Sequence, residues 1–167
     1  MPLPVSSCRS LSFLPFEKKG KYIIMKRHSL LLIFLFLISA GNAMAERLAV
    51  IAPMANIRSG PGTQYDVLWQ VEKYYPILVI EKSDPWYQFK DFEGDTGWVH
   101  KSLVGSVEAV ITKKDLCNIR SGPGTGEKIL FTVEKGIPFK VLEHKENWLH
   151  IEHADGDQGW IHDSLVW

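Results

Sequence analysis

The chain has 167 residues, of which 46% are hydrophobic, and it carries 19 basic and 19 acidic side chains. This length fits one ordinary domain or two small ones, and the hydrophobic fraction argues against a disordered chain. Two cysteines exclude a disulfide-rich scaffold and a four-thiolate zinc site. Residues 1–45 hold six basic residues and one acidic residue, which leaves 13 basic and 18 acidic residues beyond them. The remainder is therefore acidic, and we expect no nucleic-acid partner.

The N-terminal part has the features of a secretory signal peptide. Two basic residues precede an unbroken apolar run over 30–38, and an Ala-Met-Ala cleavage motif ends at Ala45. The run is about half of the roughly 20 apolar residues that a membrane-spanning helix needs. We predict a signal peptide over 25–45, cleavage after Ala45, a periplasmic or secreted location and no stable membrane insertion afterwards. A retained signal anchor is the alternative, and residues 1–24 are interpreted as an upstream start-site extension.

The rest of the chain consists of one unit that occurs twice. An eight-residue segment beginning at Asn56 recurs letter for letter from Asn118, an offset of 62 residues. The offset continues without a gap over 56–104 and 118–166, where 24 of 49 aligned positions are identical. Two copies with this period are unlike the usual solenoid repeats. The pattern indicates a duplicated domain, with copy one at 46–106 and copy two at 107–167.

Each copy has the pattern of short β-strands separated by turns. The Ser-Gly-Pro-Gly segment at 59–62 is a predicted turn, because proline fixes φ and glycine permits positive φ. No convincing amphipathic helix is present, and about five short strands in roughly 60 residues predict a small, strongly bent barrel. The predicted strands include 75–80, 86–90 and 96–100 in copy one and 148–152 and 159–162 in copy two.

Both copies contain Asn-x-Arg-x-Gly-Pro-Gly, then a tryptophan about 30 residues later, then Gly-Trp followed by Val or Ile. This combination resembles the bacterial SH3-like domain, SH3b, over roughly 48–167. The resemblance implies an all-β fold of two tandem small SH3-like β-barrels. In that family such domains accompany cell-wall hydrolases or stand alone in tandem. There they are thought to bind the peptide part of peptidoglycan or to mediate contacts between proteins.

Most of the repeated residues are interpreted as structural. We expect the asparagines to bond nearby backbone, the glycines to permit turns, and the Gly-Trp tryptophans to cross the barrel core beside a closely approaching strand. Cys117 aligns with Ala55, which predicts a small buried hydrophobe. The structural motif residues are Asn56, Gly60, Pro61, Gly62, Gly97 and Trp98 in copy one, and Asn118, Gly122, Pro123, Gly124, Trp148, Gly159 and Trp160 in copy two.

Aromatic residues differ most between the copies. Over the aligned segments copy one has nine aromatic residues and copy two has four. Exposed tyrosine and tryptophan supply contact area at little entropy cost, so we hypothesise that copy one carries the main ligand groove. Packing between the copies is an equally open role for the tyrosines. An arginine at 58 or 120 either lays its stem on the barrel or grips a peptide carboxylate. The candidate ligand-binding residues are Tyr65, Tyr74, Tyr75, Trp86, Arg58 and Arg120.

Residues that resemble catalytic or metal-binding sets lack the required pattern. Strand alternation places His150 and Glu152 on one face and His153 on the other, unlike a zinc ligand set. Cys117 precedes a turn, and copy one lacks a cysteine there. We therefore expect no catalytic residue, no metal and no cofactor. The predicted function is non-enzymatic binding of peptidoglycan peptide or another extended peptide; an adaptor for an envelope protein is the alternative, and a cell-wall peptide hydrolase is the third.

Cleavage after Ala45 predicts that the exported protein begins at Glu46 and lacks Cys8, because signal peptidase cuts after the small residues of an A-x-A motif. Mass spectrometry of the exported protein measures this N-terminus directly. An exported product that keeps its leader would contradict the prediction and favour the signal anchor.

Overall fold

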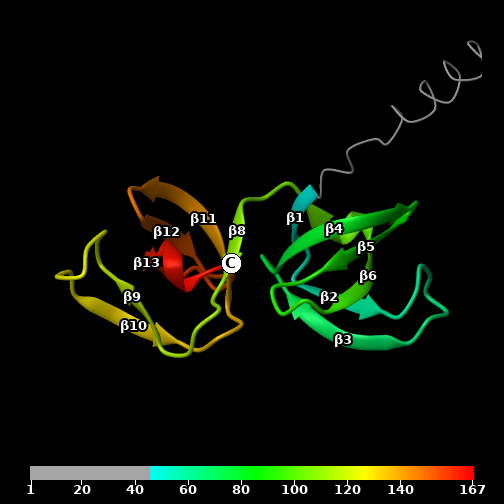
Figure 1. The fold of residues 1–167 in the computed structure, drawn as a ribbon, viewed down its shortest axis with the longest axis horizontal. Coiled ribbons are helices and arrows are strands. Elements are labelled where there is room, and N and C mark those ends of the chain that lie inside the picture. The colour runs from blue at the N-terminus through cyan, green and yellow to red at the C-terminus, as the bar shows by residue number, and fades with distance from the viewer. Residues whose placement is uncertain (1–45) are drawn as a thin grey trace, which may run out of the picture. The chain divides into compact units, whose positions relative to one another are not determined.

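The computed structural model describes residues 46–167, which belong to one compact unit (Figure 1). The predicted leader, with its extension at 1–24 and signal peptide at 25–45, lies outside the described residues. Within 46–167 no helix is long and apolar enough to cross a membrane. The fold is all-β, as predicted, and it consists of two tandem small SH3-like domains.

Copy one forms a seven-stranded antiparallel sheet in the order β3-β2-β6-β5-β4-β1-β7. The sheet curls so that β1 pairs with both β4 and β7, while β2 pairs with both β3 and β6. Its elements are β1 (Glu46–Val50), β2 (Met54–Arg58), β3 (Val67–Glu72), β4 (Pro76–Ser83), β5 (Trp86–Lys90), β6 (Thr96–His100), the 3-10 turn η2 (Lys101–Leu103) and β7 (Val104–Gly105).

Copy two repeats this arrangement in the order β10-β9-β13-β12-β11-β8. The isolated bridge between Thr112 and Val166 corresponds, at the offset of 62, to the pairing of Val50 with Val104. Both copies are therefore closed by the same contact near their ends. The elements are β8 (Ala109–Ile111), β9 (Cys117–Arg120), β10 (Ile129–Val133), β11 (Pro138–Lys145), β12 (Trp148–Glu152), β13 (Gln158–His162) and the 3-10 turn η3 (Asp163–Leu165).

The predicted hairpin strands are confirmed, with one difference in length. β5 and β6 coincide with the predicted 86–90 and 96–100, and Gly94 takes φ +97° in the turn between them. β4 continues to Ser83 instead of ending at Ile80. The reason is that polar residues after Ile80 still pair with β5, as when Ser83 lies opposite Trp86.

Two large core residues exchange places between the copies. In copy one Ile77 and Phe89 are fully buried, and the aligned residues of copy two are Phe139 and Ile151. Each core therefore holds one phenylalanine and one isoleucine at this pair of positions. Such volume-conserving exchange is what a closely packed interior tolerates best.

The expectation that Trp98 and Trp160 cross the barrel core is wrong. Alternation along β6 turns Gly97 and Val99 inward, so Trp98 lies on the opposite face and is half-buried. Trp160 is half-buried as well and stacks on His150, with ring centroids 5.0 Å apart. The close approach beside the glycine is confirmed, but an isoleucine from the neighbouring strand occupies the space.

Substituting Gly159→Ala is predicted to destabilise the protein by about 1–3 kcal/mol, the usual cost of overpacking a core. The added methyl group would collide with Ile119 Cγ2 and lie 3.0 Å from the carbonyl oxygen of Arg120. Urea denaturation measures the change in the free energy of unfolding. The matched control is Gly126→Ala, where the methyl group meets no atom within 4 Å. Equal stability of the two variants would contradict the close-approach account.

Candidate functional site

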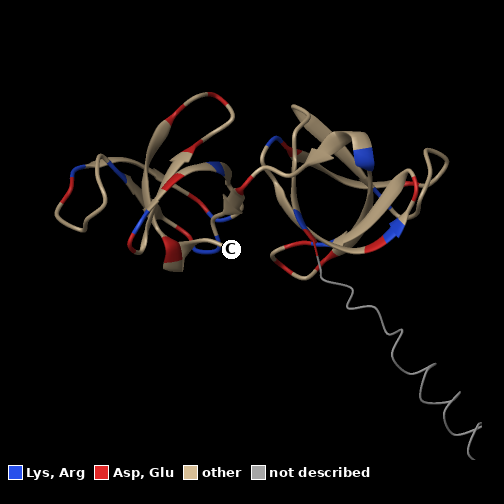
Figure 2. Ribbon diagram, turned by 90° about the horizontal axis from the view of Figure 1, so that it is seen from above, with Lys and Arg blue, Asp and Glu red and all other residues tan. Residues whose placement is uncertain are grey.

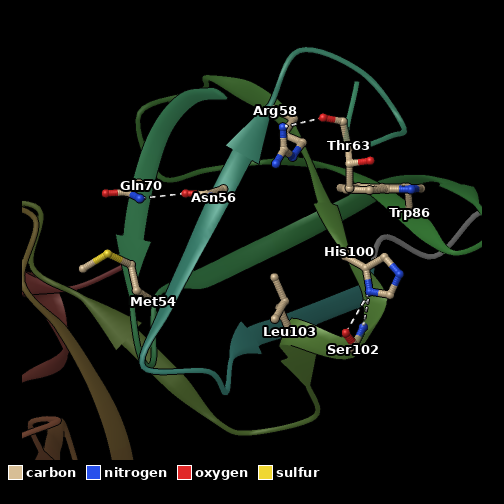
Figure 3. A pocket seen from close by; sticks show the side chains of 9 residues that line it. All are labelled: Met54, Asn56, Arg58, Thr63, Gln70, Trp86, His100, Ser102 and Leu103. Atoms are coloured by element: carbon tan, nitrogen blue, oxygen red, sulfur yellow. Dashed lines mark hydrogen bonds between the residues drawn. The ribbon is translucent and has the colours of Figure 1, made fainter. Parts of the chain in front are cut away.

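A surface groove of about 430 Å³ lies on copy one (Figure 3). Alternation along β2 buries Ala55 and Ile57 and turns the residues between and beside them toward this groove. We call it the Trp86 groove; of the sequence-predicted binding residues it contains Trp86 and Arg58. The residues that line it are Met54, Asn56, Arg58, Thr63, Gln70, Trp86, His100, Ser102 and Leu103.

An aromatic pair forms one wall of the Trp86 groove. Trp86 and His100 lie opposite each other on β5 and β6, and their rings meet edge to face with centroids 5.2 Å apart. His100 Nδ1 accepts the backbone N–H of Ser102 at 3.3 Å and lies 2.8 Å from the Ser102 hydroxyl. This network assigns the acceptor role to Nδ1, which makes Nε2 the donor of the neutral ring.

Arg58 is tied to its own loop. Its Nη1 donates to the carbonyl oxygens of Thr63 at 3.1 Å and Tyr65 at 2.7 Å (Figure 3 shows the first). Arg120 does the same in copy two, where Nη1 donates to the carbonyl of Glu127 at 2.7 Å. These bonds give both arginines a part in holding the Gly-Pro-Gly loop. The grip on a ligand carboxylate stays a prediction.

Asn56 bonds a side chain, whereas the sequence led us to expect a backbone partner. Its Oδ1 accepts from Gln70 Nε2 at 2.7 Å, across the β2–β3 pair (Figure 3). The two amides therefore present an ordered polar edge to the groove. The prediction that Gly60 and Gly62 supply a positive φ to the turn is wrong, since neither has one. Glycine is needed at position 60 because a Cβ there would collide with the Tyr65 ring.

The three candidate tyrosines lie apart from the Trp86 groove. Tyr65 is 42% exposed and packs against Gly60 in the loop. Tyr74 is buried in a cluster with Ala49 and Ala109, so it contacts both copies, as the packing alternative describes. Tyr75 is directed to the turn between β5 and β6. The role of these tyrosines in ligand binding stays a prediction.

Tyr75 belongs to a tight polar cluster around Asp91. Its hydroxyl donates to Asp91 Oδ2 at 3.0 Å. Asp91 Oδ1 in turn accepts the backbone N–H groups of Glu93, Gly94 and Asp95, each at 2.9 Å. Burial, followed by the charge of Asp91, raises the pKa of Tyr75 well above its ordinary range.

Copy two repeats the constellation of the Trp86 groove. Trp148 and His162 have centroids 5.2 Å apart at 87°, and His162 Nδ1 accepts the Ser164 N–H at 3.3 Å. Among the residues that line the groove, only Met54 and Gln70 are not repeated, because copy two has leucine and threonine at the aligned positions. Sequence reasoning did not select the histidine and serine as binding residues, although their recurrence in both copies was visible. The seven lining residues that recur are Asn118, Arg120, Thr125, Trp148, His162, Ser164 and Leu165.

The described titratable residues lack the pattern of a metal site. Within 46–167 no three His, Cys, Asp or Glu side chains gather as metal ligands. Cys117 is 1% exposed, donates to the Lys114 carbonyl at 3.0 Å, and burial raises the pKa of its thiol. The prediction of a buried structural cysteine is confirmed. Lys and Arg segments are scattered among Asp and Glu segments on the described ribbon, without a continuous basic stripe (Figure 2).

Comparison with known proteins identifies the class of the domains. The family model described as Bacterial SH3 domain matches residues 52–105 and 113–167. The chain therefore belongs to the bacterial SH3 domain family, which confirms the resemblance in both copies.

Curated relatives are larger proteins. "Putative N-acetylmuramoyl-L-alanine amidase YrvJ" from Bacillus subtilis is 28% identical over 134 residues, covering 73% of this chain and 26% of that protein. "Probable cell wall amidase LytH" from Staphylococcus epidermidis is 31% identical over 52 residues, covering 30% of this chain and 18% of that protein. The chain thus spans about a quarter or less of these relatives. A solved NlpC/P60 family protein from Bacillus cereus is 12% identical to this chain, and the match covers 73% of this chain and 56% of that protein with a TM-score of 0.36.

The raised pKa of Tyr75 predicts an alkaline loss of stability. In the folded state Tyr75 stays un-ionised at pH values above the pKa of about 10 that it has in the unfolded chain. Its contribution to the free energy of unfolding is therefore complete below about pH 10 and falls as the pH rises above that value. Tyr75→Phe is expected to cost about 1 kcal/mol at neutral pH and to remove this part of the alkaline decline. Denaturation at several pH values measures both effects, with Tyr65→Phe as the exposed control. An alkaline decline that Tyr75→Phe leaves unchanged would contradict the assignment.

Proposed function

We propose that this protein is a non-enzymatic component of the cell envelope that binds peptidoglycan peptide, or another extended peptide, in the Trp86 groove. Membership of the bacterial SH3 domain family supports this role, and so do relatives whose names place them among cell-wall amidases. The observation that carries the proposal is the Trp86 groove itself. It joins an aromatic wall to ordered amide, hydroxyl and guanidinium groups at one surface.

The chemistry of the groove suits an extended peptide. Its volume of about 430 Å³ is in the usual range for small-ligand sites, and it is open on the surface. The Trp86–His100 pair offers apolar contact, and His100 Nε2 offers a donor. The Asn56–Gln70 pair supplies further polar groups for a peptide backbone. A shallow site of this kind contacts the backbone and a few side chains of a bound peptide, so we expect modest affinity.

The repetition of the constellation in copy two supports a second, weaker engagement of the same ligand. Trp148 and His162 keep the edge-to-face geometry of their counterparts in copy one. Two modest sites strengthen binding to a polymeric ligand when both can engage at once. Copy one at 46–106 and copy two at 107–167 are accordingly proposed as the two binding modules, in a periplasmic or secreted protein.

An adaptor for an envelope protein is the second candidate. Its support is a pair of exposed apolar residues that recurs in both copies, Val67 and Leu68 on β3 and Ile129 and Leu130 on β10. Each of these side chains is 44–51% exposed. Exposed apolar side chains on an edge strand are suited to a protein partner. For hydrolysis, the third function, the buried thiol of Cys117 argues against a nucleophilic role.

Met54→Glu is predicted to reduce binding to washed peptidoglycan sacculi about tenfold, because it places a carboxylate on the apolar rim of the Trp86 groove. Met54 is 58% exposed, so the fold should tolerate the change. The measurement is co-sedimentation of the protein with sacculi in enough salt to screen surface charge. Ile80→Glu on β4 is the matched control, since Ile80 is 46% exposed and lies outside the groove.

Equal loss of pelleting in both variants would show that surface charge, and not the groove, governs the result. Absence of pelleting by the unmodified protein would overturn wall binding and leave the adaptor. Crosslinking through β3 and β10 would then be the way to identify the partner.

A further inference from the structure

Copy two contains another cavity, of about 340 Å³, which shares no residue with the counterpart of the Trp86 groove. It lies among β10, the turn before β11 and the turn between β12 and β13. Four apolar side chains form its floor, and we name it the Phe139 cavity after the most deeply buried of them. These are Phe131, Val133, Ile137 and Phe139.

At the corresponding positions copy one holds a bonded pair of side chains. Tyr75 stands where copy two has Ile137, and its ring meets Phe92 edge to face at 6.3 Å. Its hydroxyl bonds Asp91, whose place is taken in copy two by His153. An alanine replaces the phenylalanine. Copy two lacks these two rings and this hydrogen bond, and the rings of Phe139 and His153 line an open, partly apolar cavity there.

The wall of the Phe139 cavity is held in place by buried contacts. The fully buried hydroxyl of Thr112 donates to the Glu134 carbonyl at 2.7 Å and accepts the Ile137 N–H at 2.9 Å. The ring of His153 packs against Phe139, with centroids 5.6 Å apart. The cavity is therefore preformed and does not depend on a ligand to order its walls.

Negative charge rims the apolar floor. Three carboxylates line the cavity, those of Glu134, Asp155 and Asp157, and its lining contains no lysine or arginine. The backbone N–H of Asp157, followed by the His153 side chain 2.9 Å away, lowers the pKa of Asp155. The adjacent Lys135 is paired with Glu93 at 2.5 Å. Asp155 shares its carboxylate with His153, whereas Glu134 and Asp157 form no ion pair with another described residue. An apolar floor beneath these carboxylates complements an ammonium group on an aliphatic stem.

We propose that the Phe139 cavity binds a lysine-type side chain of a peptide, with the alkyl stem against Phe131 and Phe139 and the ammonium group at Asp155 and Asp157. Copy two thereby gains a recognition site at the positions that the Tyr75–Asp91 pair holds in copy one. Copy two would then recognise a lysine-type side chain at a site that is distinct from the groove of copy one. This inference does not require that the Trp86 groove bind peptidoglycan.

The test is an NMR titration of ¹⁵N-labelled protein, expressed from the full sequence, with Nα-acetyl-L-lysine amide. We expect amide shifts confined to residues 133–139 and 153–157. Nα-acetyl-norleucine amide has the same stem without the charge, and it should bind about tenfold more weakly or worse. Equal binding of the two ligands, or shifts at Trp86 and His100 instead, would overturn the proposal.

Two variants complete the test. Ile137→Tyr with His153→Asp introduces the hydrogen-bonding pair of copy one and should abolish the titration, whereas Leu142→Tyr, on an exposed residue outside the cavity, should not. Asp155→Asn with Asp157→Asn alters only exposed carboxylates and should weaken lysine binding about tenfold. Unchanged affinity in the asparagine variant would overturn the proposal even if the variant carrying Ile137→Tyr failed to fold.

Met54→Glu separates this site from the proposed wall-binding function. It should leave the lysine titration unchanged while it weakens pelleting with sacculi. Intact lysine binding without pelleting would refute only the wall-binding proposal. Pelleting without lysine binding would refute only the proposal that the Phe139 cavity binds a lysine-type side chain.

Discussion

Each barrel depends on the close approach of two strands that are distant in the sequence. β2 meets β6 where Arg58 lies opposite Trp98, and β9 meets β13 where Arg120 lies opposite Trp160. Glycine precedes each tryptophan, because an isoleucine of the facing strand fills the space that a Cβ would take. The Trp86 groove follows from this closure, since it needs Arg58 from β2 and His100 from β6 on adjoining strands.

Core and surface have diverged under different constraints in the two copies. The exchange of Ile77 and Phe89 for Phe139 and Ile151 keeps the summed volume of this buried pair, the kind of change that a packed core tolerates best. At the turn beside β5, by contrast, the bonded Tyr75–Asp91 pair is replaced by isoleucine and histidine, which line a surface cavity. A cavity at the surface costs less than one in the core, because water or a ligand can occupy it.

The aromatic surplus of copy one has several separate explanations. Tyr65 packs against Gly60 in its loop, Tyr74 lies in a buried cluster that includes Ala109 of copy two, and Tyr75 satisfies the buried carboxylate of Asp91. A count of rings could not distinguish these roles, since binding, packing and hydrogen bonding all favour tyrosine and tryptophan. The distinction comes from what lies opposite each ring, which depends on residues far away in the chain.

The sequence by itself determined the duplication, the all-β class, the hairpin of β5 and β6, and the buried character of Cys117. These features rest on local alternation, turn residues and an exact offset, all of which are visible along one chain. Tertiary structure decided that Trp98 lies outside the core and that His100 and Ser102 join Trp86 in one groove. It also decided that Ile137 lines a surface cavity whereas Tyr75 bonds Asp91. Alternation assigns residues to opposite faces, but only the closure of the curved sheet determines which face is inside and which side chains meet across it.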